Sequence, residues 1–307
     1  MITRFFSRSK PIHLVLTALF ALFLFFWMRK DQLIDALSFG LILEQLGMYI
    51  VVFGSIALLS FMVNKNTLTL RNNFAILLFV LLIAMMPFGL KDNSILWSNF
   101  FVLLALRRII SLKSNINVKK KLLDASIWIS IASLFYFWSI LFFGLIFAAL
   151  FLFAIPNLKN WSIPFIGIAI VAIIATSYSI ITTGTIDDFS WFIQPLNYDF
   201  SNYNNLQSII AITLILSLGI WALFFYIRSI SDKPKALRSA HILVMYAALT
   251  GLIIIGVTPQ KNGTEFLFLF APLAIVMANY LEAVSDRWFG ELFVWLIICS
   301  PIVALLL

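Results

Sequence analysis

Residues 97–112 read Trp97-Ser-Asn-Phe-Phe-Val-Leu-Leu-Ala-Leu-Arg-Arg-Ile-Ile-Ser-Leu112, and a short polar loop then leads to Lys119-Lys120-Lys121. The tract that follows, residues 125–155, contains no charged side chain. A basic cluster beside a long uncharged run is typical of a membrane protein that turns round at the cytoplasmic face. Whether the tract crosses the membrane once or twice determines the side on which every later loop lies.

Composition assigns the whole chain to the membrane class. Of its 307 residues 63% are hydrophobic, and the mean hydropathy is +1.05, whereas soluble domains contain about 45–50% apolar residues. The apolar runs are each about 17–25 residues long, which is the length of a helix that crosses about 30 Å of hydrocarbon. Strict alternation, the pattern of transmembrane strands, is absent. We therefore predict an all-α polytopic bundle, residues 1–307, with about 10–11 spans and a cytoplasmic N-terminus.

Several function classes are disfavoured because the residues and motifs that they require are missing from the sequence. Cys299 is the single cysteine, so neither an internal disulfide framework nor a cysteine cluster for a metal is expected. There is no Walker motif, Gly-rich dinucleotide turn or His-Glu-x-x-His motif. The net charge of +8 resides between apolar runs, which indicates topology and a bilayer partner instead of nucleic acid.

Charge placement favours two passes for residues 122–155. With one pass, the loop 184–206, which contains aspartates and no Lys or Arg, would be cytoplasmic, and the basic linker 228–238 would lie outside. With two passes and a turn near residues 139–144, only four of 21 Lys and Arg lie outside: Arg29, Lys30, Lys91 and Lys261. A deep re-entrant hairpin satisfies the charges equally well.

These four outer cations are the first candidate site. Each lies near an acidic residue: Arg29 and Lys30 precede Asp31 and Asp35, Lys91 precedes Asp92, and Lys261 lies four residues before Glu265. Basic groups at the bilayer edge can hold a phosphate or pyrophosphate headgroup, and a carboxylate can take a proton from an attacking hydroxyl. Solvated loop ends with weak local ion pairs are the alternative.

Two outer segments extend this candidate site. The pattern over residues 31–43 predicts a short interfacial helix, with the second span beginning near Leu46 and Glu44 at the membrane boundary. The loop 184–206 is long for a connector and rich in aromatic residues, so it is either a lid over an amphipathic substrate or a segment held in the headgroup region.

Arg107 and Arg108 lie about one turn inside their span. Their long side chains can reach the headgroups, so we interpret them as topological anchors. The alternative is an interior arginine that pairs with a carboxylate on another helix, of which Asp124 is the nearest candidate.

The tract from Asn99 to Leu112, Lys119-Lys120-Lys121 with Asp124, Ser133 to Trp138, and Lys261-Asn-Gly-Thr-Glu265 resemble an uncharacterised family of polytopic inner-membrane proteins from Bacteroidota. The layout, with an acidic first outer loop after span one, is weakly similar to polyprenol-dependent glycosyltransferases of the GT-C type. That resemblance implies that Asp31 or Asp35 takes the catalytic position and that Arg29, Lys91 and Lys261 face the lipid phosphate. From the charge placement we add Lys30 to the phosphate-binding groups and Glu44, Asp92 and Glu265 as supporting polar residues.

Three functions are therefore considered, all in the bacterial inner membrane. The first is transfer of a sugar from a polyprenyl-phosphate carrier at the periplasmic face, without a metal or other cofactor. The second is a non-catalytic subunit of an envelope complex for secretion, motility or glycan export. The third is a transporter or lipid flippase, which predicts charges buried at the midplane.

Overall fold

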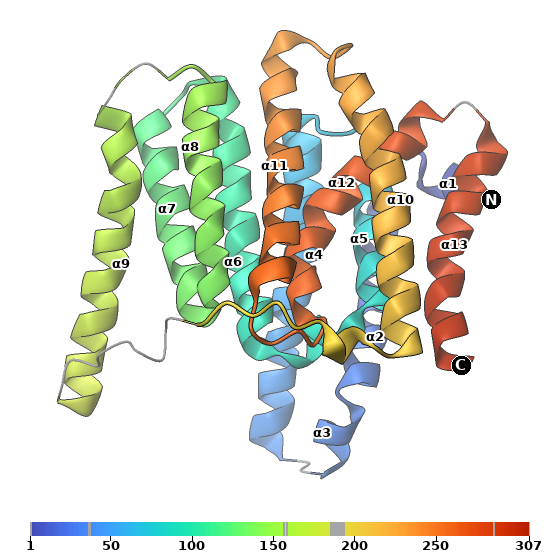
Figure 1. The fold of residues 1–307 in the computed structure, drawn as a ribbon, viewed down its shortest axis with the longest axis horizontal. Coiled ribbons are helices and arrows are strands. Elements are labelled where there is room, and N and C mark those ends of the chain that lie inside the picture. Colours follow the sequence, from blue (N-terminus) through green and yellow to red (C-terminus); the bar gives the residue numbers. More distant parts are fainter. Residues whose placement is uncertain are drawn as a thin grey trace.

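The computed structural model describes residues 2–35, 38–155, 157, 159–184, 194–284 and 286–306, and every regular element within these ranges is a helix (Figure 1). The α-helices are α1 (Ile2–Phe6), α2 (Pro11–Met28), α3 (Lys30–Asp35), α4 (Phe39–Asn66), α5 (Phe74–Met85), α6 (Asn93–Ile110), α7 (Val118–Phe135), α8 (Phe143–Leu152), α9 (Lys159–Thr183), α10 (Leu206–Ile230), α11 (Lys235–Val257), α12 (Leu267–Ala283) and α13 (Arg287–Leu306). Five short 3₁₀ turns lie between them: η1 (Pro87–Lys91), η2 (Ser111–Ser114), η3 (Phe137–Phe142), η4 (Ser201–Tyr203) and η5 (Thr264–Phe266).

The predicted all-α polytopic bundle is confirmed. Seven helical segments among the described residues are long and apolar enough to cross a membrane, and three further apolar helices are shorter: 74–85, 137–152 and 288–301. The shorter helices explain why length and composition identify fewer spans than the sequence predicts. At 12 residues, α5 is only about 18 Å long.

The core lies where α5 and α12 pack together. Every side chain of α5 is buried, and so is every side chain of α12 from Leu267 to Leu281. A helix that is apolar on all sides can be enclosed by other helices, because none of its faces needs contact with water. The two central helices are covered by α2, α4, α6, α10, α11 and α13.

Residues 118–152 form two antiparallel helical segments, α7 followed by η3 with α8, and their contacts with α11 show this directly. At the start of α11 the Ser239 hydroxyl donates to the Leu152 carbonyl at 3.0 Å. Just beyond its other end, the Thr258 hydroxyl is hydrogen-bonded to the Tyr136 hydroxyl. The chain therefore turns at Tyr136, where α7 ends, slightly before the predicted turn at residues 139–144.

The bundle has two chemically different ends. We call the end with residues 66–73, 111–118 and 229–238 the basic end, because the Lys and Arg side chains gather there. Two hydrogen bonds connect segments at this end: Lys113 Nζ donates to the Asn66 carbonyl at 2.6 Å, and Lys233 Nζ donates to Asn279 Oδ1 at 3.2 Å. The opposite end carries α3, η1, η4 and η5, and we call it the outer end after the prediction that its loops lie outside.

The first outer segment differs in detail from the predicted interfacial helix at 31–43. It is divided between the six-residue α3 and the start of α4. Ser38 accepts a hydrogen bond from the Leu41 N–H at 3.2 Å and so begins α4 at Phe39. No break separates this start from the span itself, and α4 continues to Asn66. Residues 36–37 lie outside the described residues, as do 185–193 of the predicted loop 184–206.

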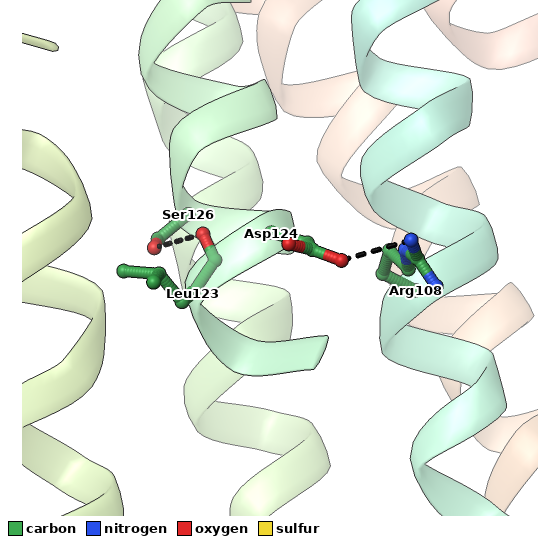
Figure 2. A network of polar contacts seen from close by, with 4 residues as sticks. All are labelled: Arg108, Leu123, Asp124 and Ser126. Carbon is green, nitrogen blue, oxygen red and sulfur yellow. Dashed lines mark hydrogen bonds and ion pairs between the residues drawn. The ribbon is translucent and has the colours of Figure 1, made fainter. Parts of the chain in front are cut away.

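The interpretation of Arg108 as a topological anchor is corrected by an ion pair between α6 and α7. Its Nη2 lies 2.9 Å from Asp124 Oδ2, so the alternative assignment is the observed one (Figure 2). Arg107 instead lies over the Phe61 ring, 4.7 Å from its centroid. On the far side of α7, Gly167 of α9 approaches Ser126 so closely that a Cβ there would lie 2.0 Å from the Ser126 hydroxyl.

Candidate functional site

Arg29 is the centre of the first outer-end cluster. It follows the last residue of α2 and is only 1% exposed. Its Nε donates to the Leu90 carbonyl at 2.6 Å, Nη1 to Gln45 Oε1 at 2.7 Å and Nη2 to Asn93 Oδ1 at 2.7 Å. The guanidinium also lies 4.6 Å from the Phe25 ring centroid. One side chain thus ties α2 to α4, η1 and α6.

Acidic residues surround this arginine, and none of those whose side chains the structure describes forms a direct ion pair with it. Glu44 accepts a hydrogen bond from Asn93 Nδ2 at 2.9 Å, so Asn93 links the carboxylate to the guanidinium. Asp92 caps α6 by accepting from the Ser94 and Ile95 N–H groups at 2.8 and 3.1 Å. Burial lowers the pKa of Arg29, and the charges of Glu44 and Asp92 act in the opposite direction.

Lys261 is the second buried outer cation, at 1% exposed. Its three ammonium hydrogens have three carbonyl acceptors at the end of α11: those of Ile255 at 3.1 Å, Gly256 at 2.9 Å and Thr258 at 3.1 Å. A cation is favourable there because the last carbonyls of a helix are otherwise unpaired and carry partial negative charge. Burial lowers the pKa of Lys261, while Asp199 raises it.

The loop before α10 covers Lys261. Phe200 places its ring centroid 4.3 Å from the Lys261 Nζ. The Asn197 N–H donates to the Val257 carbonyl at 3.2 Å, and its side-chain amide donates to the Pro259 carbonyl at 3.0 Å. This part of the predicted aromatic lid is therefore packed against the end of α11.

Glu265 lies in η5 and is fully buried. Gly263, with a φ of 87°, makes the left-handed turn that leads into it. Glu265 Oε1 finds no hydrogen-bond partner within the described part of the chain. The local pair with Lys261 that the sequence spacing allows is absent from the described contacts, since the lysine is occupied by backbone carbonyls.

The two clusters are joined through η1. This turn packs against both α2 and η5. A Cβ at Gly89 would lie 3.3 Å from the Thr264 carbonyl oxygen, and one at Gly263 would lie 2.9 Å from the Phe88 ring. The first, second and fifth outer loops thus converge, with their buried polar groups directed into the protein.

Three further predicted site residues lie beside these clusters with exposed side chains. Asp31 on α3 is exposed, and so are Lys30 and Lys91. Lys30 Nζ lies 5.2 Å from the Trp27 ring centroid. The backbone of Asp35 ends α3, whereas its side chain lies outside the described residues.

The chemistry open to each group follows from its neighbours. Arg29 and Lys261 give their donors to the protein itself, so they hold loops together as the chain stands. Asp31, Lys30 and Lys91 are free to meet water, headgroups or a ligand. No group of three or more His, Cys, Asp or Glu that could hold a metal occurs among the residues that the structure describes.

Sequence reasoning missed Gln45 and Asn93, the two neutral side chains that bind Arg29, and the hydrogen bond between Tyr136 and Thr258. Uncharged amide side chains give no charge signal. The one available hint was that Asn93 and Gln45 follow directly after Asp92 and Glu44 at the ends of apolar runs.

A bundle of long apolar helices, closed at one end by packed polar loops, defines a multi-pass α-helical membrane protein. The chain belongs to a particular family within this class, described as "Family of unknown function (DUF6427)", whose family model matches residues 1–306. The expectation of an uncharacterised family is thereby confirmed. No curated protein and no solved structure matches the chain.

Proposed function

We propose that this protein is a non-catalytic subunit of a multi-protein complex in the bacterial inner membrane, and that α4 binds a transmembrane helix of another subunit. The observation that carries the proposal is a seam on α4. Gly40, Gly47 and Gly54 recur every seven residues, with Leu43 and Ile50 between them. Residues at this spacing lie on nearly one face of a helix.

The outer half of the seam has no partner within the described chain. A Cβ at Gly40 or Gly47 would meet nothing within 4 Å, and Leu43 and Ile50 are 63% and 66% exposed. A glycine inside a helix is destabilising by about 0.5–1 kcal/mol relative to alanine. Small residues allow close approach of two helices in a membrane, which compensates for that loss. Lipid contact alone requires no glycine.

The inner half of the seam is hollowed. A pocket of about 360 Å³ lies between α4 and α6, lined by Gly54, Ala57, Leu58, Phe61, Phe100 and Arg107. An apolar side chain of the partner helix would fill this pocket. The buried bonds of Arg29 and Lys261 also favour a structural role for the outer end.

The test is copurification from membranes of the native host. We expect one partner at fixed stoichiometry with the wild-type protein and at least about tenfold less with Gly47→Leu, because a leucine blocks close approach. The matched control is Gly144→Leu, since Gly144 on α8 is exposed and equally open. Equal recovery from all three proteins, or recovery of a second copy of this chain alone, would contradict the proposal.

Transfer of a sugar from a polyprenyl-phosphate carrier is the second candidate. It is favoured by the convergence of three outer loops and by the exposure of Asp31, Lys30 and Lys91 beside them. Asp31 or Asp35 would act as general base, with the two lysines on the phosphate. Alanine variants of Asp31, Asp35 and Lys91 should then alter the glycan profile, whereas Asp199→Asn should not. Wild-type glycans in all the alanine variants would exclude this function.

A further inference from the structure

A second site lies at the basic end, opposite the loops described above. A pocket of about 340 Å³ separates the N-terminal segment from the junction of α12 and α13. Its polar lining comes from Thr3, Arg4, Ser7, Asn72, Glu282 and Asp286. From the structure we infer that this pocket binds the headgroup of a zwitterionic phospholipid with a primary ammonium group, that is, a phosphatidylethanolamine.

The two carboxylates distinguish this pocket from its surroundings. The basic end otherwise carries an excess of Lys and Arg, and Asp124 at this end is paired with Arg108. Glu282 Oε1 accepts from the Leu70 N–H at 2.9 Å and from Asn72 Nδ2 at 2.5 Å, so the carboxylate is fixed in position. Asp286 is exposed at the rim. A primary ammonium can donate charge-assisted hydrogen bonds to both.

Arg4 supplies the complementary charge for the phosphate. It lies on α1, which packs against α13 and α5. Thr3 holds α1 in place, since its N–H and hydroxyl donate to Glu291 Oε1 at 3.1 and 2.7 Å. Arginine matches the geometry of phosphate oxygens well. A cation and two carboxylates in one pocket match a zwitterion better than a purely anionic headgroup.

The residues in and around the pocket are typical of the headgroup level of a membrane. Its apolar lining comes from Leu70, Phe74, Leu281 and Val284, which can meet the start of an acyl chain. Beside it, Phe5, Trp288 and Phe289 are 46%, 67% and 51% exposed. Exposed Trp and other aromatic side chains are typical of the headgroup level. A lipid headgroup is therefore within reach from the side.

The test uses the purified full-length protein in a neutral detergent, with retained lipid counted by native mass spectrometry. The probes are palmitoyl-oleoyl phosphatidylethanolamine, phosphatidylcholine and phosphatidylglycerol, which differ only in headgroup. We expect half-saturation with phosphatidylethanolamine at about tenfold lower concentration than with either of the others. The choline group cannot donate N–H bonds, and the glycerol headgroup lacks the cation for Asp286 and Glu282.

Two variants locate the site. Asp286→Asn should weaken phosphatidylethanolamine binding about tenfold and leave phosphatidylcholine unchanged, and Arg4→Gln should weaken phosphatidylethanolamine by a similar factor. Asp232→Asn and Arg8→Gln are the matched controls, because both residues are exposed at the same end and neither lines the pocket. Glu282 is not varied, since it also holds Leu70 and Asn72.

Three results would overturn the inference: equal affinity for the three lipids, preference for phosphatidylglycerol, or wild-type binding by Asp286→Asn. Saturation by soluble phosphoethanolamine at the concentration needed for the lipid would assign the pocket to a soluble zwitterion instead. Size-exclusion profiles matching the wild type establish that each variant is folded.

Discussion

Arg108 and Asp124 form an ion pair between α6 and α7, with Nη2 and Oδ2 2.9 Å apart (Figure 2). The two helices also share a stack of aromatic rings, in which Phe101 lies 5.6 Å from Trp128 and 5.7 Å from Phe135. The Ser98 hydroxyl donates to the Ala132 carbonyl at 2.9 Å. Polar and aromatic contacts therefore hold together two helices whose surroundings are apolar.

Removal of this ion pair should show a measurable coupling. In a double-mutant cycle of Arg108→Gln and Asp124→Asn, we expect a coupling free energy of about 1 kcal/mol, because both side chains are partly exposed. Denaturant unfolding in detergent micelles measures it. Arg107→Gln combined with Asp124→Asn is the control and should be additive, since Arg107 faces Phe61. Additivity of the Arg108 pair would contradict the assigned contact.

Replacement of Arg29 should destabilise the outer end. Arg29→Met leaves the Leu90 carbonyl, Gln45 and Asn93 without their donor in a buried site. We expect it to lower the free energy of unfolding by about 2–4 kcal/mol. Thermal unfolding of the purified protein provides the measurement. Lys30→Met is the matched control, because Lys30 is exposed, and it should change stability by no more than about 0.5 kcal/mol. Similar melting of the two variants would count against a structural role for Arg29.

Two glycines of α11 should respond differently to the same change. A Cβ at Gly251 would lie 2.8 Å from the Leu269 Cα, which is backbone and cannot rotate away, whereas one at Gly256 would meet nothing within 4 Å. We expect Gly251→Ala to lower the unfolding free energy by about 1–3 kcal/mol. Gly256→Ala should be neutral or slightly stabilising. A stabilised Gly251→Ala protein would show that α11 and α12 are not in close contact.

The prediction that the chain returns to the same side of the membrane over residues 122–155 is open to a labelling test. In a Cys299→Ala background, cysteines at Asn115 and Asn157 should react with a membrane-impermeant maleimide from the same side, and a cysteine at Asn202 from the opposite side. All three positions are exposed in the structure. Intact cells and inverted vesicles provide the two directions of access. Labelling of Asn115 and Asn157 from opposite sides would indicate a single crossing.

Parts of the candidate site could be read from the sequence, because charge is unusual in so apolar a chain. The outer placement of Arg29 and Lys261 drew attention to residues that do organise the outer end. Their partners could not be predicted, since Gln45, Asn93 and the carbonyls at the end of α11 leave no mark in a hydropathy pattern. The assignment of these two cations to a phosphate stays a prediction, although their donors are directed into the protein.

By itself, the sequence determined the class, because the cost of burying charge and unpaired backbone in hydrocarbon forces long apolar runs into helices. It also favoured the double crossing, since loop charge follows membrane side. Only the tertiary structure decided that Arg108 pairs with Asp124, that η1 joins the outer clusters, and that the turn falls at Tyr136. These outcomes depend on which helices become neighbours. Packing of side chains between distant segments settles that, and no local periodicity records it.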